Sequence, residues 1–193
     1  RVSVDSTGAQ SNGVSMNPSI SADGRYVAFD SAATNLVAGD TNGTWDVFVH
    51  DRHTGQTTRV SVDSTGAQSN NVSVYPSISA DGRYVAFESY ATNLVAGDTN
   101  DFQDVFVHDR QTGQTTRVSV DSTGAQSNGY SFLPSISADG RYVAFQSTAD
   151  NLVTGDTNSR LDIFVHDRHA GQTTRVSADS NSVQGNEGSG NPS

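Results

Sequence analysis

PSISADGRYVAF, residues Pro18 to Phe29, decides the fold of this chain, because the chain repeats it. The stretch returns unchanged at Pro76 to Phe87 and at Pro134 to Phe145, which gives a period of 58 residues (18, 76, 134). Each period opens with RVS, at Arg1, Arg59, Arg117 and Arg175. The 193 residues therefore hold three full periods and part of a fourth.

The composition indicates many short strands joined by turns. Apolar residues make up 33% of the chain, whereas a typical globular domain has roughly 45–50% with glycine included. Serine, threonine, asparagine, aspartate and glycine fill the difference, and a helical core would use leucine, alanine, glutamate and lysine instead. The chain has no cysteine, which excludes disulfides and thiolate metal sites.

The charge excludes two classes of partner. The net charge is −10, there is no lysine, and the 11 arginines are spread by the repeat. Nucleic acid and anionic membranes are bound by clustered basic residues, so we expect neither partner. No apolar run is long enough for membrane insertion. A chain without cysteine and lysine that is rich in serine and threonine predicts a secreted, cell-surface or periplasmic bacterial protein.

Each period is expected to form four antiparallel strands. In the first period these strands are residues 17–21, 25–31, 46–51 and 57–62. Asp23-Gly24 and the glycine of His53-Thr54-Gly55 mark the two hairpin turns, since glycine accepts the positive φ of a tight turn. Bulky side chains on both faces of the middle strands are typical of a sheet packed between two others.

This pattern predicts an all-β fold built of β-propeller blades with four antiparallel strands each. A β-solenoid is the alternative, but its coils are usually shorter and lack such hairpins. We expect blades at residues 17–62, 75–120 and 133–178. Residues 1–16 would end a preceding blade, and residues 179–193 would start a truncated fourth repeat.

SISADGRYVAF resembles the S-P-D-G-(K/R)-x-(V/I)-A-F signature of TolB-like, WD-repeat-like β-propeller repeat proteins. The match covers all three full periods but departs at Ala22, Ala80 and Ala138, where the family commonly has proline. The Trp-Asp pair of true WD repeats does not recur with the period, since the dipeptide occurs once, at Trp45-Asp46. The resemblance implies a ring of about six or seven blades, often in the periplasm or outside the cell. It implies no single function, because propellers serve many.

Three blades do not close a ring of the usual size, and their open flanks would expose sheet faces and edges. Either further blades of a longer chain complete the ring, or copies of the chain assemble. In a ring of two copies, residues 1–16 and 175–190 occupy the same phase of the repeat and compete for one position. We therefore expect head-to-tail assembly or strand exchange through these ends.

The positions that differ between periods gather in the loops before the first strand and between the second and third strands. In a four-stranded blade these loops lie on one face of the disc. Aromatic and apolar residues there favour recognition, because they offer contact area at low entropic cost. The predicted ligand-binding residues are Met16, Asn17, Trp45, Tyr75, Tyr90, Phe102, Tyr130 and Phe132. The alternative is that these side chains fill irregular gaps between blades.

The motif GDTN-x-x-x-D returns in every period and resembles the start of a calcium loop, with oxygen ligands at alternate positions. The candidate Ca²⁺ ligands are Asp40, Asn42, Asp46, Asp98, Asn100, Asp104, Asp156, Asn158 and Asp162. Three ligands per loop fall short of the six to eight that calcium takes, and Arg160 in the third loop opposes a cation. The alternative is an Asx-turn, in which these side chains bond nearby backbone N–H groups.

His50-Asp51-Arg52 returns at His108 and His166, but the sequence does not predict a catalytic site. A triad needs a distinguished nucleophile and an oxyanion hole, and no G-x-S-x-G motif is present. A catalytic group is also normally unique in a chain, whereas this motif occurs three times. We expect the histidines to pack or cap, and the protein to be non-enzymatic, with Ca²⁺ as its one candidate cofactor.

These observations favour a binding or scaffold propeller whose variable loops recognise carbohydrate or protein. Trp45 and the tyrosines would stack on sugar rings, and repeated sites would raise avidity. Two other functions also fit the sequence. One is a structural protein that assembles into rings or filaments, and the other is the regulatory propeller of a larger enzyme.

Overall fold

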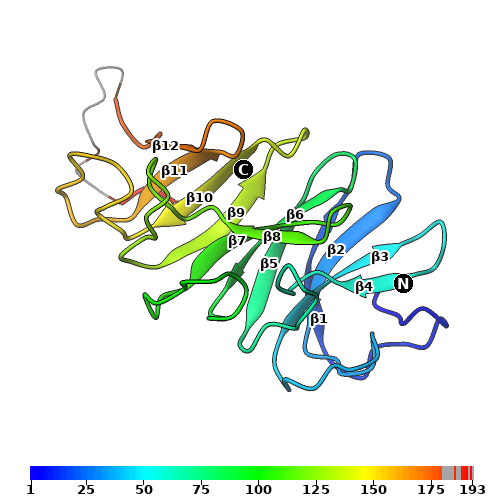
Figure 1. The fold of residues 1–193 in the computed structure, drawn as a ribbon. Helices are drawn as coiled ribbons and strands as arrows, with labels where there is room; N and C mark the ends of the chain where they lie inside the picture. Colours follow the sequence, from blue (N-terminus) through cyan, green and yellow to red (C-terminus); the bar gives the residue numbers. More distant parts are fainter. Residues whose placement is uncertain (180–184, 186–187, 191, 193) are drawn as a thin grey trace.

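The computed structural model describes residues 1–179, 185, 188–190 and 192, and contains three antiparallel sheets of four strands each. The sheets follow one another along the chain, from blue through green to orange in Figure 1. Blade 1 contains β1 (Ser15–Ile20), β2 (Tyr26–Ser31), β3 (Asp46–Asp51) and β4 (Thr57–Arg59). Blade 2 contains β5 (Ser73–Ile78), β6 (Tyr84–Ser89), β7 (Asp104–Asp109) and β8 (Gln114–Arg117). Blade 3 contains β9 (Ser131–Ile136), β10 (Tyr142–Ser147), β11 (Asp162–Asp167) and β12 (Gln172–Arg175).

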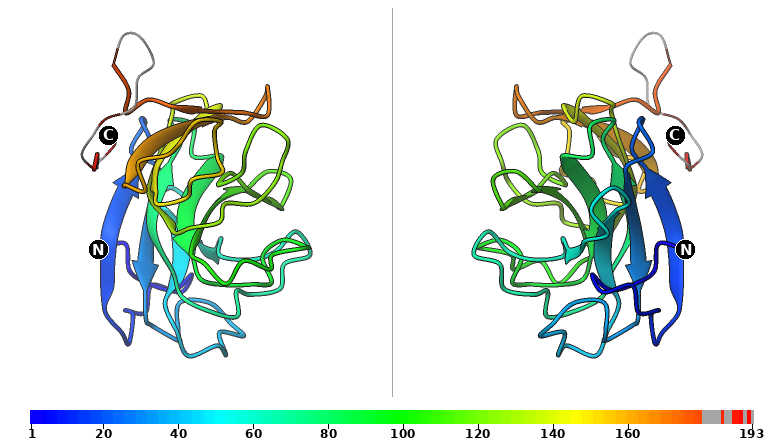
Figure 2. Two further views of the ribbon diagram at one scale, coloured as in Figure 1. Left: turned by 90° about the vertical axis from the view of Figure 1, so that its left-hand side faces the viewer. Right: turned by 90° about the vertical axis from the view of Figure 1, so that its right-hand side faces the viewer.

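Strands that are neighbours in sequence are neighbours in each sheet, so the four-stranded repeat predicted from the sequence is present. The side views in Figure 2 show strands and loops only. In the part of the chain that the structure describes, no helix is long and apolar enough to cross a membrane. The first strands of successive blades contact one another, β1 with β5 and β5 with β9, and so form the inner side of the arrangement.

The turn between the first two strands of a blade forms as predicted. In blade 1, Gly24 has φ 72°, and its N–H donates to the Ser21 carbonyl at 2.9 Å. Asp23 Oδ1 accepts from the Ser21 hydroxyl at 2.6 Å and from the Arg25 N–H at 2.9 Å. The second predicted turn places Gly55 at φ 78°. These bonds join residues close in sequence, which is why the repeated stretch predicts them.

The first strand of each blade begins earlier than predicted and carries a bulge. β1 starts at Ser15 rather than at residue 17, and its register with β2 shifts between Met16 and Ser19. The shift occurs where Asn17, with φ 48°, precedes Pro18. Proline has no N–H for the ladder, so a strand contains it at an edge or an irregularity. The equivalent residues of the other blades, Tyr75 and Leu133, have φ 53° and 50°.

The fourth strand is shorter than predicted. β4 ends at Arg59, whereas the sequence predicts a strand over 57–62. The N–H groups of Val60 and Ser61 both point to the Val47 carbonyl, at 2.8 and 3.4 Å, so the regular ladder stops there. The Ser61 hydroxyl accepts from the Val47 N–H at 3.1 Å. A side chain has therefore taken the place of the next backbone acceptor.

The hydrophobic core lies between blades. One buried cluster joins Val47, Val49 and Val60 of blade 1 to Val85 and Phe87 of blade 2. A second cluster joins the equivalent side chains of blades 2 and 3. Since β2 and β3 carry bulky side chains on both faces, each blade packs through these faces on its neighbours.

The Asp-Gly turns also contact the neighbouring blade, which gives a matched test of blade packing. A Cβ on Gly82 would lie 2.1 Å from Cδ2 of Tyr26, whereas a Cβ on Gly24 would lie 3.6 Å from its nearest atom, in Arg52. Both glycines have positive φ, 73° and 72°. Gly24→Ala should lower the free energy of unfolding by about 1 kcal/mol. Gly82→Ala should lower it by about 2–3 kcal/mol, because Tyr26 must also move.

Urea unfolding of the two alanine variants measures this difference. Equal losses of stability would contradict a tight contact between the turn of blade 2 and Tyr26 of blade 1.

The partial fourth repeat is described at only a few residues. The Ser189 N–H donates to the Leu161 carbonyl at 2.7 Å, as the Ser131 N–H does to the Gln103 carbonyl at 2.8 Å. The remainder of the predicted repeat over 179–193, namely 180–184, 186–187, 191 and 193, lies outside the described residues.

Candidate functional site

Each blade buries a polar cluster that contains the candidate calcium ligands. In blade 2, Arg117 Nη1 lies 3.0 Å from Oδ1 of Asp98 and 3.3 Å from Oδ2 of Asp104. Asp104 Oδ1 accepts from the hydroxyls of Ser119 at 2.5 Å and Ser127 at 3.0 Å. The positively charged group that contacts these candidate calcium ligands is therefore the guanidinium of Arg117. The equivalent arginines are Arg59 in blade 1 and Arg175 in blade 3.

The asparagine of the motif bonds within this cluster. Asn100 Nδ2 donates to Asp104 Oδ2 at 3.0 Å, and Asn100 Oδ1 accepts from the Phe102 N–H at 3.2 Å. The second bond is the Asx-turn named above as the alternative to a calcium loop. Among the described residues, no group of three or more His, Asp and Glu side chains is arranged to hold a metal ion. Calcium binding by the nine motif residues stays a prediction.

The repeated histidines are buried and bonded to threonines. His108 Nδ1 lies 2.9 Å from Thr115 Oγ1, and the Thr115 hydroxyl donates to the Val62 carbonyl at 2.5 Å. Since this hydroxyl has one hydrogen, His108 Nδ1 is the donor. Burial lowers the pKa of His108 to about 4, so the ring is neutral near pH 7. His50 and His166 make the same bond to their threonines. The histidine and threonine of each blade therefore hold the chain segment that precedes that blade.

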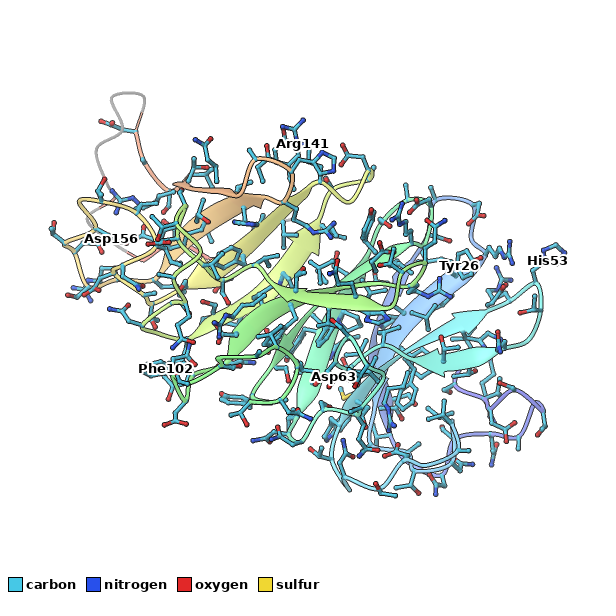
Figure 3. The ribbon with its side chains drawn as sticks, viewed as in Figure 1. Tyr26, His53, Asp63, Phe102, Arg141 and Asp156 are labelled. Carbon is cyan, nitrogen blue, oxygen red and sulfur yellow. The ribbon has the colours of Figure 1, made fainter. Side chains whose placement is uncertain are left out.

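The loops that vary between periods share one side of the blades, which we call the variable face. The Asn12 N–H donates to Asn35 Oδ1 at 2.9 Å, so the loop before β1 lies beside the loop after β2. Figure 3 shows Phe102 on this side, with Tyr26 and Arg141 on the opposite side. The variable positions are thus gathered on one face, as expected for a four-stranded blade.

A pocket of about 430 Å³ opens on the variable face between blades 2 and 3. Its walls are mostly apolar, with four aromatic side chains, a leucine and three polar side chains. The lining residues are Tyr75, Glu88, Tyr90, Gln103, Tyr130, Phe132, Leu133 and Thr148. Phe102 packs edge-on against Tyr130, with ring centroids 5.0 Å apart. A concave, largely apolar site with a few polar groups is the usual form of a small-ligand site.

Glu88 on β6 is the buried acid of this pocket, with 4% of its surface exposed. Glu88 Oε1 accepts from Gln103 Nε2 at 2.5 Å, and Oε2 accepts from the Leu133 N–H at 2.6 Å. The Leu133 N–H is available because the bulge in β9 turns it out of the ladder. Burial raises the pKa of the Glu88 carboxyl to about 7, against the opposing effect of both hydrogen bonds.

The equivalent buried carboxyl between blades 1 and 2 is that of Asp30. Asp30 Oδ1 accepts from Asn17 Nδ2 at 2.9 Å and from the Tyr75 N–H at 3.1 Å. Asp30 is 1% exposed, and burial raises the pKa of its carboxyl. At both junctions a carboxylate of one blade therefore holds the bulge N–H of the next blade.

Comparisons with known proteins address the fold. No profile of a known protein family and no curated protein sequence matches the chain. TolB from Acinetobacter baumannii is similar over 89% of this chain, with 18% identity and a TM-score of 0.53. A TolB-type protein from Agrobacterium tumefaciens is similar over 84%, with 17% identity and a TM-score of 0.55. This chain has a TolB-like β-propeller fold.

The propeller domain of the Trilobed protease from Pyrococcus furiosus is also similar, over 84% of this chain, with 11% identity and a TM-score of 0.50. This chain spans 34%, 48% and 41% of the three similar chains, so it covers less than half of each. At these sequence identities the similarity shows the fold only, so the function has to be inferred from the residues of the site.

The propeller brings together some of the predicted ligand-binding residues and separates others. The four that line the pocket are Tyr75, Tyr90, Tyr130 and Phe132, and Phe102 supports Tyr130. Met16, Asn17 and Trp45 come from blade 1 and do not line this pocket. The predicted ligand-binding residues therefore do not form one continuous site, because each junction between blades is lined by its own side chains.

Two of these side chains lie in strands, although the sequence predicts that each comes just before a strand. Met16 belongs to β1 and Phe132 to β9, because the first strand of each blade starts at the residue equivalent to Ser15.

The sequence-based prediction also missed Glu88, Gln103, Leu133 and Thr148, which complete the pocket. The sequence did contain a sign of Glu88. The unchanged RYVAF is followed by a different polar residue in each period, namely Asp30, Glu88 or Gln146.

Proposed function

We propose that this propeller is a non-enzymatic binding module whose pocket between blades 2 and 3 holds a neutral sugar ring of a carbohydrate. The observation that carries this proposal is the set of four aromatic side chains grouped around the buried Glu88. A secreted, cell-surface or periplasmic location belongs to the same proposal, because carbohydrate ligands are plentiful there.

The aromatic walls suit the apolar faces of a sugar. Tyr75, Tyr90 and Tyr130 are 44%, 42% and 44% exposed, so their rings can cover a ligand without any rearrangement of the core. Stacking of this kind brings large contact area at little entropic cost. Gln103 and Thr148 supply the polar groups that would bond sugar hydroxyls and select among rings.

The charge of the pocket favours a neutral ligand. With a pKa of about 7, Glu88 is partly protonated at neutral pH and offers less than a full negative charge. No arginine lines the pocket, so an anionic ligand would find no partner there. A protein partner would need about 800 Å² of surface on each side, whereas the feature observed is a pocket of about 430 Å³.

A panel of immobilised neutral oligosaccharides, followed by calorimetry with the best ligand, tests this function. Tyr90→Ala should weaken binding about tenfold or more, because stacking contacts at the centre of a site dominate its affinity. Repeat 1 carries Ala32 at this position, so alanine is compatible with the fold. Tyr142→Ala is the matched control, since Tyr142 is 40% exposed, begins β10 and does not line the pocket.

Binding by Tyr142→Ala should equal that of the unaltered chain. The proposal fails if no neutral oligosaccharide binds at millimolar concentration, or if Tyr90→Ala binds as tightly as the unaltered chain.

A further inference from the structure

The pocket between blades 2 and 3 has an aromatic rim and a polar floor. Tyr75, Tyr90 and Tyr130 are each more than 40% exposed, whereas Glu88 and Gln103 are 4% and 7% exposed. A ligand therefore meets the aromatic rings first, and only a small group of the ligand reaches the buried polar atoms.

The floor cannot satisfy a group that carries many hydroxyls. The lining contains three polar side chains, those of Glu88, Gln103 and Thr148, among apolar and aromatic ones. A ligand hydroxyl that loses water without gaining a partner weakens binding. The part of the ligand that enters the pocket is therefore mostly apolar and carries few polar atoms.

Glu88 fixes the orientation of the Gln103 amide. Glu88 Oε1 accepts from Gln103 Nε2 at 2.5 Å, and the Leu133 N–H donates to Glu88 Oε2 at 2.6 Å. Because Nε2 faces the carboxylate, Gln103 Oε1 is the amide atom left to accept from a ligand. Among the residues that the structure describes, no group donates to this oxygen.

Thr148 supplies a donor from the other blade. The Tyr130 N–H donates to Thr148 Oγ1 at 3.0 Å, so the hydroxyl hydrogen of Thr148 is left to donate. Gln103 directly precedes β7 of blade 2, and Thr148 directly follows β10 of blade 3. The pocket thus offers one acceptor from one blade and one donor from the next.

We propose that this pocket selects sugars that carry an acetamido group and binds that group on its floor, an inference that rests on the carbohydrate binding proposed above. A secondary amide is planar and trans, so its N–H and carbonyl point to opposite sides. The N–H donates to Gln103 Oε1, and the carbonyl accepts from the Thr148 hydroxyl. The methyl group packs on Phe132 and Leu133, while the sugar ring stays at the rim and stacks on the tyrosines.

The repeat does not reproduce this set of polar atoms at the junction between blades 1 and 2. The residue equivalent to Gln103 is Trp45 in blade 1, and the residue of blade 2 equivalent to Thr148 is Tyr90. The indole of Trp45 has a donor and no acceptor. We therefore expect one acetamido site in the part of the chain that the structure describes.

Calorimetry with two pairs of sugars tests the inference on the full chain. Chitotriose and cellotriose share their linkage and differ only in an acetamido group or a hydroxyl at one carbon of each ring. N-acetylgalactosamine and galactose form the second pair. In at least one pair the acetamido sugar should bind about tenfold tighter or more, because its hydroxyl counterpart leaves the buried amide of Gln103 without a partner. The stoichiometry should be one sugar per chain.

Gln103→Leu separates recognition of the acetamido group from stacking. Leucine suits the position, because Leu161 occupies it in blade 3. This variant should reduce the preference within a pair to less than about twofold, since the acceptor is removed and the aromatic rim is kept. Tyr90→Ala should weaken both members of a pair by the same factor. Thr148→Ala is the second variant, because Ala32 occupies this position in blade 1, and it should also reduce the preference.

The outcomes separate this inference from the proposed function. If both members of each pair bind equally, or if only sugars without an acetamido group bind, the inference is overturned and carbohydrate binding stands. An acetamido preference that Gln103→Leu and Thr148→Ala both leave unchanged would also overturn it. If no neutral sugar of the panel binds, the proposed function fails and the inference fails with it.

Discussion

Replacing Arg117 with methionine is expected to lower the free energy of unfolding by about 3–5 kcal/mol, because it leaves two buried carboxylates without their cation. The side chains of Arg117, Asp98 and Asp104 are 10%, 3% and 0% exposed. Methionine keeps much of the apolar stem of arginine, so the loss measures the charge more than the volume. Urea unfolding monitored by circular dichroism gives the change in free energy.

Two further variants make this prediction specific. Arg160→Met removes an exposed arginine of the loop between β10 and β11 and should cost less than about 0.5 kcal/mol. Adding Asp98→Asn to Arg117→Met should recover part of the loss, since one buried charge is then removed with its partner. If Arg117→Met costs no more than Arg160→Met, the buried ion cluster is not a main source of stability.

The second prediction with a large expected effect concerns Glu88 and the dependence of the free energy of unfolding on pH. The pKa of this carboxyl is raised by burial from 4.5 to about 7 in the folded chain. Between these values the folded state keeps a proton that the unfolded state has released, so stability falls as pH rises from about 4.5 to above 7. The fall from this group amounts to about 3 kcal/mol.

Glu88→Gln should remove this part of the pH dependence and make the chain more stable than the unaltered chain at pH 8. Glutamine suits the position, because Gln146 occupies it in blade 3 and is 3% exposed. Other buried carboxyls with raised pKa add a slope of the same sign that both proteins share, so the difference between the proteins reports Glu88 alone. Gln111→Ala, which changes no charge at an exposed position, is the control and should leave the slope unchanged.

Unfolding curves at pH 5, 6, 7 and 8 give the comparison. Parallel stability–pH curves for Glu88→Gln and the unaltered chain would contradict a raised pKa at Glu88, and with it the argument for a neutral ligand.

Much of the propeller could be predicted from residues close together in sequence. The Asp23-Gly24 turn forms through bonds that span two to five residues, so every copy of the stretch forms it independently of its neighbours. The alternation of bulky residues on both faces of β2 and β3 likewise predicts a sheet buried on two sides. Comparison of the periods predicted the variable face and four of the residues that line its pocket, whereas ligand binding by these residues stays a prediction.

The tertiary structure decided which of those residues form a site. Glu88 meets the Leu133 N–H across 45 positions of sequence, and that contact exists only because blade 3 packs on blade 2 and the bulge at Leu133 frees an N–H. The buried position of Arg117 between Asp98 and Asp104 likewise depends on the packing of a whole blade. Turns and strands arise from hydrogen bonds between near neighbours or from a repeated pattern. The pocket and its buried acid arise from desolvation and contact between blades, which no single period contains.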